Sequence, residues 1–379
     1  GVYTLLFFAI VSGILFAFAT SPYRTHSRRS SNPSQDRQAD VSARIIFAVA
    51  FAAGLYAIHA VFVELLPAML AGQGTRQLYF LNYRFHNIVL IMLLPAFSLY
   101  ASRQYTTNTR FWTITAAVVG IVLLTGSRGS LLLVGIILAC GLVLRGRRFS
   151  PSWYLIAIPI IGVLLTYLRY LFRESWRFPT YSAFLEHHGG YTGVFFNTVE
   201  MSMAEVLTTL VHNLEQFRRP FYEGILGVLL YPVPRAWLPL KPYGASGVVT
   251  ATVAPYKWEL LRSEILATGF GDLLMHYGLL GGAAVAFVVG FVWLKSLLLV
   301  LGSNYHRAAF VVPFLIWWMY VFLRGSFFNL GPWVWTFAIV SSTHIVLTRI
   351  RIRNSANAGS TDFPTTAIVG HTWHYRRTR

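Results

Sequence analysis

The sequence contains few charged residues. Only 12% of its 379 residues are Asp, Glu, Lys or Arg, whereas 55% are hydrophobic. A soluble domain usually has about 25% charged residues, so this composition argues against a soluble protein and indicates that lipid is the solvent. Apolar runs of about 20 residues can cross a bilayer as helices, because backbone groups in lipid must be hydrogen-bonded within the segment.

Cysteine and the common catalytic motifs are also scarce. Cys140 is the only cysteine, so no intramolecular disulfide can form. The chain has no P-loop, no HExxH, no G-x-S-x-G, no CxxC and no Asp-x-Asp pair. His187 and His188 are adjacent, so their rings point in different directions, and no further metal ligand is evident. We therefore expect neither a metal nor another cofactor.

Nine apolar segments have the length of a membrane span. They lie at residues 1–20, 45–63, 85–101, 111–126, 128–144, 153–171, 274–300, 308–323 and 332–348. The sequence therefore predicts an all-α polytopic integral membrane protein with about nine to twelve transmembrane helices. Its predicted parts are transmembrane helices with short loops (1–171), one large polar loop (172–272), further transmembrane helices (273–348) and a basic, disordered tail (349–379).

Basic residues are concentrated in alternate loops. The formal net charge is +18, and 18 of the 31 Lys and Arg residues lie at 21–44, 102–110, 145–148, 295–307 and 349–379. Under the positive-inside rule these loops face the cytoplasm. The basic excess is then a topology signal with contact to membrane lipids, and we predict no nucleic-acid partner. The large loop falls on the opposite side, which in a bacterium is the periplasm.

Acidic residues are concentrated in the large loop. Nine of the 13 lie in it, namely Glu174, Glu186, Glu200, Glu205, Glu215, Glu223, Glu259, Glu264 and Asp272. Asp272 and His276 are four residues apart, so on a helix their side chains share one face and can form an acid/base pair. The alternative is that Asp272 only caps a helix N-terminus. Asp272 can cap the helix and also form the pair with His276.

Four arginines lie near the predicted outer ends of spans: Arg84, Arg128, Arg235 and Arg324. The planar guanidinium group suits phosphate oxygens, which it can bind in a bidentate manner. The alternative for each one alone is that its side chain snorkels to the interface. Arg128 also lies in the segment Thr125–Ser130, whose Gly and Ser residues permit an anion-binding turn.

Two segments of the large loop have a distinct pattern. Residues 231–242 contain four prolines, which predicts a stiff, non-helical strap that presents Trp237 and Lys241 together with Arg235. A rigid connector is the alternative. Residues 201–216 have apolar side chains at helical spacing, which predicts an amphipathic helix lying on the bilayer.

Four short segments carry a resemblance to a known family. They are Leu81–Asn87, Thr125–Gly129, Val233–Pro242 and Gly271–Gly278. In these segments and in their order the chain resembles the bacterial oligosaccharide repeat-unit polymerases, the Wzy or O-antigen polymerase family, which are relatives of the O-antigen ligases. The resemblance extends over about residues 80 to 330. Family members typically have Glu where Asp272 stands, which shortens the reach of the carboxylate here.

The resemblance implies a metal-independent, GT-C-like glycosyltransferase of the bacterial inner membrane. It would move a growing glycan from undecaprenyl pyrophosphate onto the next lipid-linked repeat unit in the periplasm, with a chain-length regulator protein as a further partner. Asp272 is then the first candidate base, with His276 and Glu200 behind it. The residues expected to bind pyrophosphate and glycan are Arg84, Arg128, Arg235, Trp237, Lys241 and Arg324.

Other functions stay open. An O-antigen ligase would transfer the same donor to lipid A core or protein, and because such ligases rely on a periplasmic histidine, His276 is compatible with one. A flippase or other transporter of lipid-linked sugar would have broken helices and charges near the membrane midplane, whereas no acidic residue falls inside a predicted span. A purely structural membrane subunit would leave the outer arginines unexplained.

Overall fold

The structure is a computed structural model. It describes residues 2–20, 33–60, 84–104, 109–124, 128–144, 177–196, 199–255 except 235, and 267–358, with short pieces at 63, 67, 162–164, 166–167, 170–174 and 259. Within these residues the regular structure is entirely helical and contains no strand. The predicted all-α class is therefore confirmed for the described part of the chain.

Eight long helices form the body of the protein. They are α1 (Val2–Ala19), α2 (Pro33–Ala60), α5 (Arg84–Gln104), α6 (Thr109–Leu124), α7 (Arg128–Leu144), α16 (Thr268–Leu301), α17 (Tyr305–Arg324) and α18 (Phe327–Ala358). Among the described residues, four segments are long and apolar enough to cross a membrane: Asp36–His59, Thr268–Leu301, Tyr305–Arg324 and Phe327–Arg351. α1, α6 and α7 contain shorter apolar stretches. The predicted span at 153–171 lies mostly outside the described residues.

Some boundaries differ from the prediction. α2 and α16 begin before residues 45 and 274, so Asp36, Asp40 and Asp272 lie inside helices that were predicted to start after them. Asp36 lies in the first turn of α2, where the helix dipole favours a carboxylate. Asp36 and Asp40 also form ion pairs with Arg103 of α5, at 3.3 and 3.5 Å.

The predicted disordered tail is partly helical. α18 continues to Ala358, so the expectation of disorder was wrong for residues 349–358. After Pro332 this helix contains neither proline nor glycine up to its end, and nothing in the local sequence stops it. Residues 359–379 lie outside the described part.

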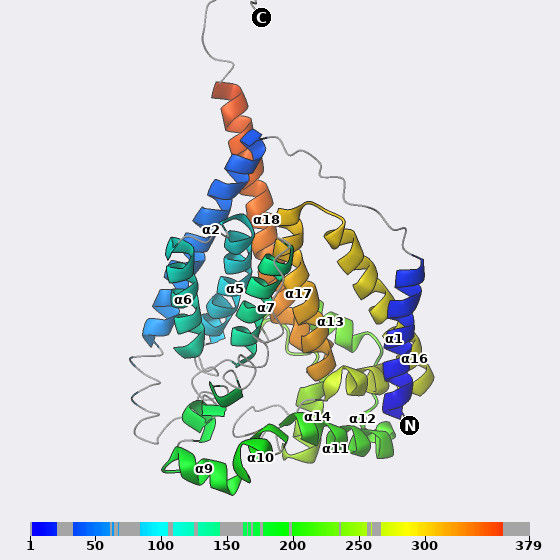
Figure 1. Ribbon diagram of the computed structural model, residues 1–379. Coiled ribbons are helices and arrows are strands. Elements are labelled where there is room, and N and C mark those ends of the chain that lie inside the picture. The colour runs from blue at the N-terminus through cyan, green and yellow to red at the C-terminus, as the bar shows by residue number, and fades with distance from the viewer. Residues whose placement is uncertain are drawn as a thin grey trace, which may run out of the picture.

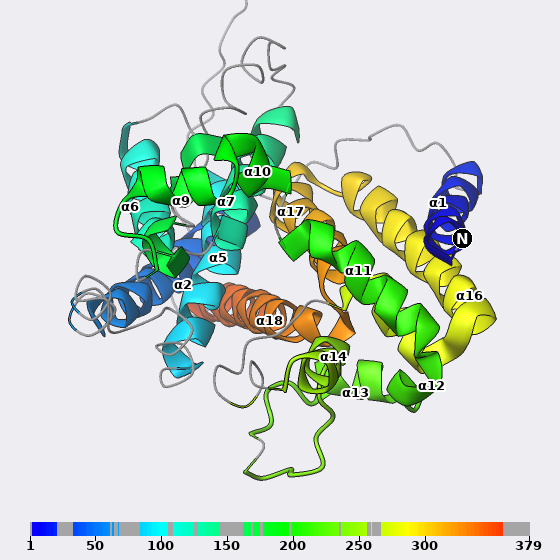
Figure 2. The same ribbon diagram turned by 90° about the horizontal axis from the view of Figure 1, so that it is seen from below.

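The long helices form two groups joined by α17 and α18 (Figures 1 and 2). In the first, α2, α5, α6 and α7 pack around a core that includes Leu93, Phe97 and Leu133. In the second, α1 packs along α16. An added side chain at Gly13 would clash with the backbone of Phe287, and one at Gly290 with the carbonyl of Ile10. Glycines allow this close approach of two backbones, as in many membrane helix pairs.

The directions of the helices follow from contacts at their ends. The Nδ1 atom of His306, at the start of α17, lies 2.8 Å from the carbonyl of Ser102, near the end of α5. The hydroxyl of the neighbouring Tyr305 donates to the carbonyl of Gly141, near the end of α7. α17 is therefore antiparallel to both helices, and the starts of α5 and α7 lie at the same end of the bundle as the end of α17.

Short helices lie across that end (Figure 1). They are α9 (Tyr181–His187), α10 (Gly190–Phe196), α11 (Val199–His212), α12 (Leu214–Phe217), α13 (Glu223–Leu229) and α14 (Ala245–Val253), preceded by a π-helical turn, η2 (Tyr170–Glu174). The predicted amphipathic helix at 201–216 corresponds to α11 and α12, with a break at Asn213. Leu207 and Leu210 of its apolar face are buried against the start of α16, so this part of the face is covered by protein.

Candidate active site

The first turns of α16 form a separate helical piece, residues 268–277. Thr268, at its start, has φ 63°, a value that is a genuine outlier for a β-branched residue. Gly278, at its end, has φ 68° and ψ −169°, a conformation that is open essentially only to glycine. Strained backbone of this kind is concentrated at functional sites. The piece carries both Asp272 and His276.

Two glycines set this piece deeply among its neighbours. A Cβ atom added to Gly269 would lie 2.5 Å from the carbonyl oxygen of Phe322 in α17. One added to Gly271 would lie 2.9 Å from a methyl group of Leu210 in α11. The two glycines of Gly269-Phe-Gly-Asp272 thus allow close packing, and this packing places the carboxylate of Asp272 inside the bundle.

Asp272 is only 1% exposed, and its two oxygens have different partners. Oδ2 accepts a 2.6 Å hydrogen bond from the backbone N–H of Phe327, the first residue of α18. Oδ1 lies 3.1 Å from Nε2 of His276. Asp272 therefore supplies the start of α18 with an acceptor from another helix, where the positive end of the helix dipole favours a carboxylate.

His276 is buried between acceptors on both sides. Nδ1 lies 2.9 Å from the carbonyl oxygen of Pro220, and Nε2 faces Asp272. A carbonyl oxygen can only accept, so Nδ1 carries a proton in this arrangement, and a second proton on Nε2 would satisfy the carboxylate as well. Gly224, near the start of α13, lies beside the ring, and a Cβ added there would be at an ordinary contact distance of 3.5 Å.

An exposed segment, Arg218–Tyr222, lies against His276, and we call it the cover segment. It is held by the Pro220 carbonyl and by a 2.9 Å hydrogen bond from the N–H of Arg219 to the carbonyl of Met275. Arg218 and Arg219 are exposed, and Phe221 is 66% exposed. Neither arginine was among the predicted site residues, although two adjacent basic residues in a loop rich in acidic residues were a usable signal.

Three of the predicted outer arginines occupy helix ends at this end of the bundle. Arg84 begins α5, Arg128 begins α7 and Arg324 ends α17. Arg324 donates from Nη1 to the hydroxyl of Tyr320, at 3.2 Å. It is also three residues from Phe327, which bonds Asp272, and three residues can span at most about 11 Å. The structure thus brings these helix ends and the Asp272–His276 pair to one side.

Other predicted site residues lie outside the described part. Arg235 is one of them, and so are the side chains of Arg84, Arg128 and Glu200. Glu200 lies in the first turn of α11. Their roles stay predictions.

The proline strap is folded back on itself by Lys241. The ammonium group of this lysine donates to the carbonyls of Tyr231 and Val233, at 2.8 and 2.9 Å, and only 7% of the residue is exposed. Trp237, by contrast, is 80% exposed. Lys241 closes the strap, whereas Trp237 is accessible to another molecule.

This arrangement can support proton transfer. An imidazole held by a carboxylate on one nitrogen can take a proton on the other, and the carboxylate stabilises the charge that forms. Among the described residues, no group of three His, Cys, Asp or Glu residues is placed to hold a metal ion. The side chains present are thus those of acid/base chemistry beside several cations.

The chain was compared with protein-family models, with curated proteins and with solved structures, and none of them matches.

Proposed function

We propose that the protein is a metal-independent glycosyltransferase that polymerises lipid-linked oligosaccharide repeat units. In this proposal it is a GT-C-like protein of the bacterial inner membrane, with about nine to twelve transmembrane helices, and residues 172–272 face the periplasm. The observation that carries the proposal is the buried Asp272–His276 pair at the end of the bundle where Arg84, Arg128 and Arg324 occupy helix ends.

The proposed reaction transfers a glycan between two lipid-linked substrates. The bond between the sugar carbon and undecaprenyl pyrophosphate breaks, and the same carbon forms a bond with a hydroxyl oxygen of the acceptor sugar. The hydroxyl proton passes to the enzyme, and the negative charge stays on the leaving pyrophosphate. Such a donor is already activated, so neither a nucleotide nor a metal is required, and fixed cations can stabilise the developing charge.

Asp272 and His276 have separate roles in this proposal. Both oxygens of Asp272 are engaged, which favours it as the group that orients the ring. His276 is then the proton acceptor through Nδ1, which faces the cover segment. This assignment reverses the order expected from the sequence, in which Asp272 was the first candidate base.

The cover segment must move for the reaction to occur, because the Pro220 carbonyl occupies the position that the acceptor hydroxyl requires. When the segment withdraws, Nδ1 loses its acceptor and can give up its proton. Arg218 and Arg219 belong to this segment and move with it, and in this proposal they bind the pyrophosphate after the movement. Lys241 is left out of the pyrophosphate-binding set, since its donors close the strap.

The test is chain extension in membranes that hold the purified lipid-linked repeat unit as both donor and acceptor. His276→Gln should abolish extension while the protein still inserts, whereas Arg37→Gln, an exposed change on α2, should have no effect. Extension at the normal rate in His276→Gln would refute the proposed mechanism.

A ligase is the second candidate, and the histidine in the buried pair is the observation that favours it. A lipopolysaccharide ladder from deletion cells separates the two functions. Loss of a polymerase leaves core with one repeat unit, whereas loss of a ligase leaves bare core.

A further inference from the structure

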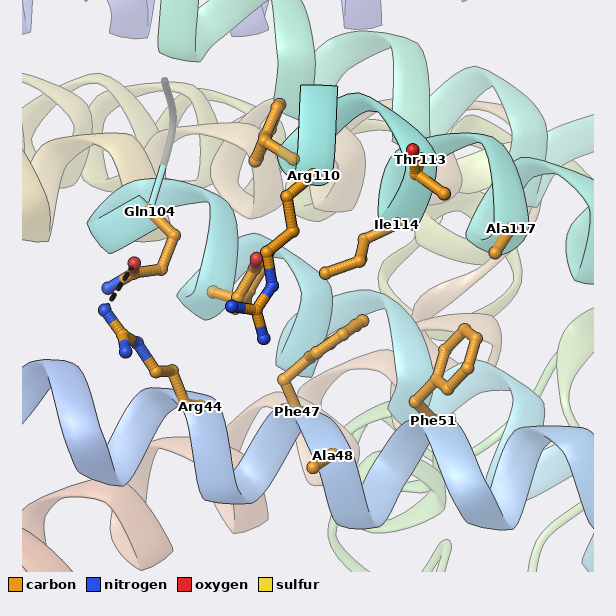
Figure 3. Close-up of a pocket in the computed structure, with 11 residues that line it drawn as sticks. Arg44, Phe47, Ala48, Phe51, Gln104, Arg110, Thr113, Ile114 and Ala117 are labelled. Atoms are coloured by element: carbon orange, nitrogen blue, oxygen red, sulfur yellow. Dashed lines mark hydrogen bonds between the residues drawn. The ribbon is translucent and has the colours of Figure 1, made fainter. Parts of the chain in front are cut away.

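A pocket at the other end of the bundle belongs to no part of the proposed reaction. It has a volume of about 640 Å³ and lies between α2, α5 and α6 (Figure 3). Gln104, which lines the pocket, is the last residue of α5. Arg84, which is predicted to bind pyrophosphate, is the first residue of the same helix. The pocket is therefore separated from the Asp272–His276 pair by the length of α5, which is about 30 Å for its residues 84–104.

The two arginines of the pocket are at one end of it, whereas Thr113, whose hydroxyl donates to the carbonyl of Thr109, lies further along with the apolar residues. Arg44, Gln104 and Arg110 lie together at one end, and a guanidinium nitrogen of Arg44 donates to the Gln104 side chain at 2.8 Å. Towards the other end the walls are formed by Phe51 and Ile114 (Figure 3). None of the lining residues is acidic.

Helical spacing produces this order. On α2, residues 44, 48 and 51 share one face, and on α6 residues 110, 114 and 117 do so. Both helices present first an arginine and then apolar side chains. From residue 44 to residue 51 the rise is about 10 Å. If α2 crosses the membrane as the candidate span Asp36–His59, the pocket would extend from its arginines towards the hydrocarbon layer.

Small residues keep the pocket open to the outside. Ala48 on α2 and Ala117 on α6 line the pocket and are exposed, as are both arginines. An opening between two apolar helices would face lipid if both helices cross the membrane. The nearby acids Asp36 and Asp40 are ion-paired with Arg103.

We propose that this pocket binds one anionic phospholipid, with its phosphate at Arg44 and Arg110 and an acyl chain along Phe51 and Ile114. The charge and shape of the pocket identify the kind of molecule that fits it. Two guanidinium groups match a phosphate diester, and the apolar walls below them match a hydrocarbon chain. The loops at this end are those predicted to be cytoplasmic, where anionic lipids attract basic residues. The proposal does not depend on the reaction proposed above.

The test uses the full chain in mild detergent and native mass spectrometry. Phosphatidylglycerol and phosphatidylcholine with identical acyl chains are titrated, and the first binding event is followed. We expect preferential binding of phosphatidylglycerol. Arg44→Gln with Arg110→Gln should weaken that binding by about 30-fold, which corresponds to two basic groups at an anionic surface. Binding of phosphatidylcholine should weaken less, because its choline group offsets the charge of the phosphate.

Two further variants make the result specific. Arg37→Gln with Arg307→Gln removes two exposed charges that do not line the pocket and should leave binding unchanged. Ala48→Leu with Ala117→Leu fills the pocket, retains every charge and should also abolish the preference. Equal weakening in the control pair, no preference in the wild type, or displacement of the lipid by an equal concentration of inorganic phosphate would each overturn the proposal.

Discussion

Asp272 accepts a 2.6 Å hydrogen bond from the backbone N–H of Phe327, which lies 55 residues away in sequence. The bond joins the first turns of α16 to the first turn of α18, with the whole of α17 between them in the chain. Because the same carboxylate also faces His276, the orientation of the imidazole depends on how three helices pack. Fold and candidate chemistry are thus coupled at one side chain.

Replacing Asp272 should destabilise the protein, and the loss should be larger when the new side chain cannot accept the hydrogen bond from Phe327. Asp272→Ala removes the acceptor of the buried Phe327 N–H and the partner of Nε2 of His276, and we expect a loss of about 3 kcal/mol. Asp272→Asn keeps an acceptor oxygen for Phe327, so the loss should be about 1 kcal/mol. Thermal unfolding in detergent measures both values, and equal losses would show that the hydrogen bond does not stabilise α18.

Replacing His276 should affect activity far more than folding. In His276→Gln the side-chain amide can still donate to Pro220, but it cannot take up a proton. We expect chain extension to fall by at least about 100-fold with little change in thermal unfolding. If extension and stability fell together in both the Gln and the Ala variants, the residue would have only a structural role.

The arginines of the cover segment provide an independent test. Arg218→Gln with Arg219→Gln should lower chain extension by at least about tenfold, since each charge-assisted hydrogen bond contributes about 1.5–3 kcal/mol. Both side chains are exposed, so the unfolding temperature should stay constant. The matched control is Arg37→Gln with Arg307→Gln. Similar losses in both pairs would indicate a general effect of net charge.

Lys241 distinguishes strap closure from substrate binding. Lys241→Met removes the donors to Tyr231 and Val233, so the strap should open and be cleaved faster in limited proteolysis. Unchanged cleavage together with lost chain extension would return Lys241 to the pyrophosphate-binding set.

The contact between α1 and α16 should tolerate no added methyl group. Gly290→Ala places a carbon against the carbonyl of Ile10, so the helices must separate and the protein should lose about 1–3 kcal/mol. Gly135→Ala on α7 is the matched control. An added Cβ there meets nothing within 4 Å, and the higher helix propensity of alanine should make the change neutral or stabilising by up to about 1 kcal/mol. Equal effects of the two changes would mean that α1 does not pack closely on α16.

The sequence alone determined the helical class and the positions of most long helices. Hydropathy and helical spacing are local properties, and a bilayer allows few backbone solutions for an apolar run. The spacing of Asp272 and His276 is local as well. It predicted that they share a face, because residues i and i+4 are neighbours on a single helix. The helix ends were less certain, as the early start of α16 and the extension of α18 to Ala358 show.

Only the tertiary structure decided what those residues contact. Phe327 contacts Asp272 and Pro220 contacts His276 from distant parts of the chain, and no local pattern encodes their approach. The backbone of Arg219 bonds Met275 in the same way. Lys241 likewise turned inward because two carbonyls of its own strap were within reach. Pairings between distant segments depend on how whole helix surfaces pack, and that information is distributed over the entire sequence.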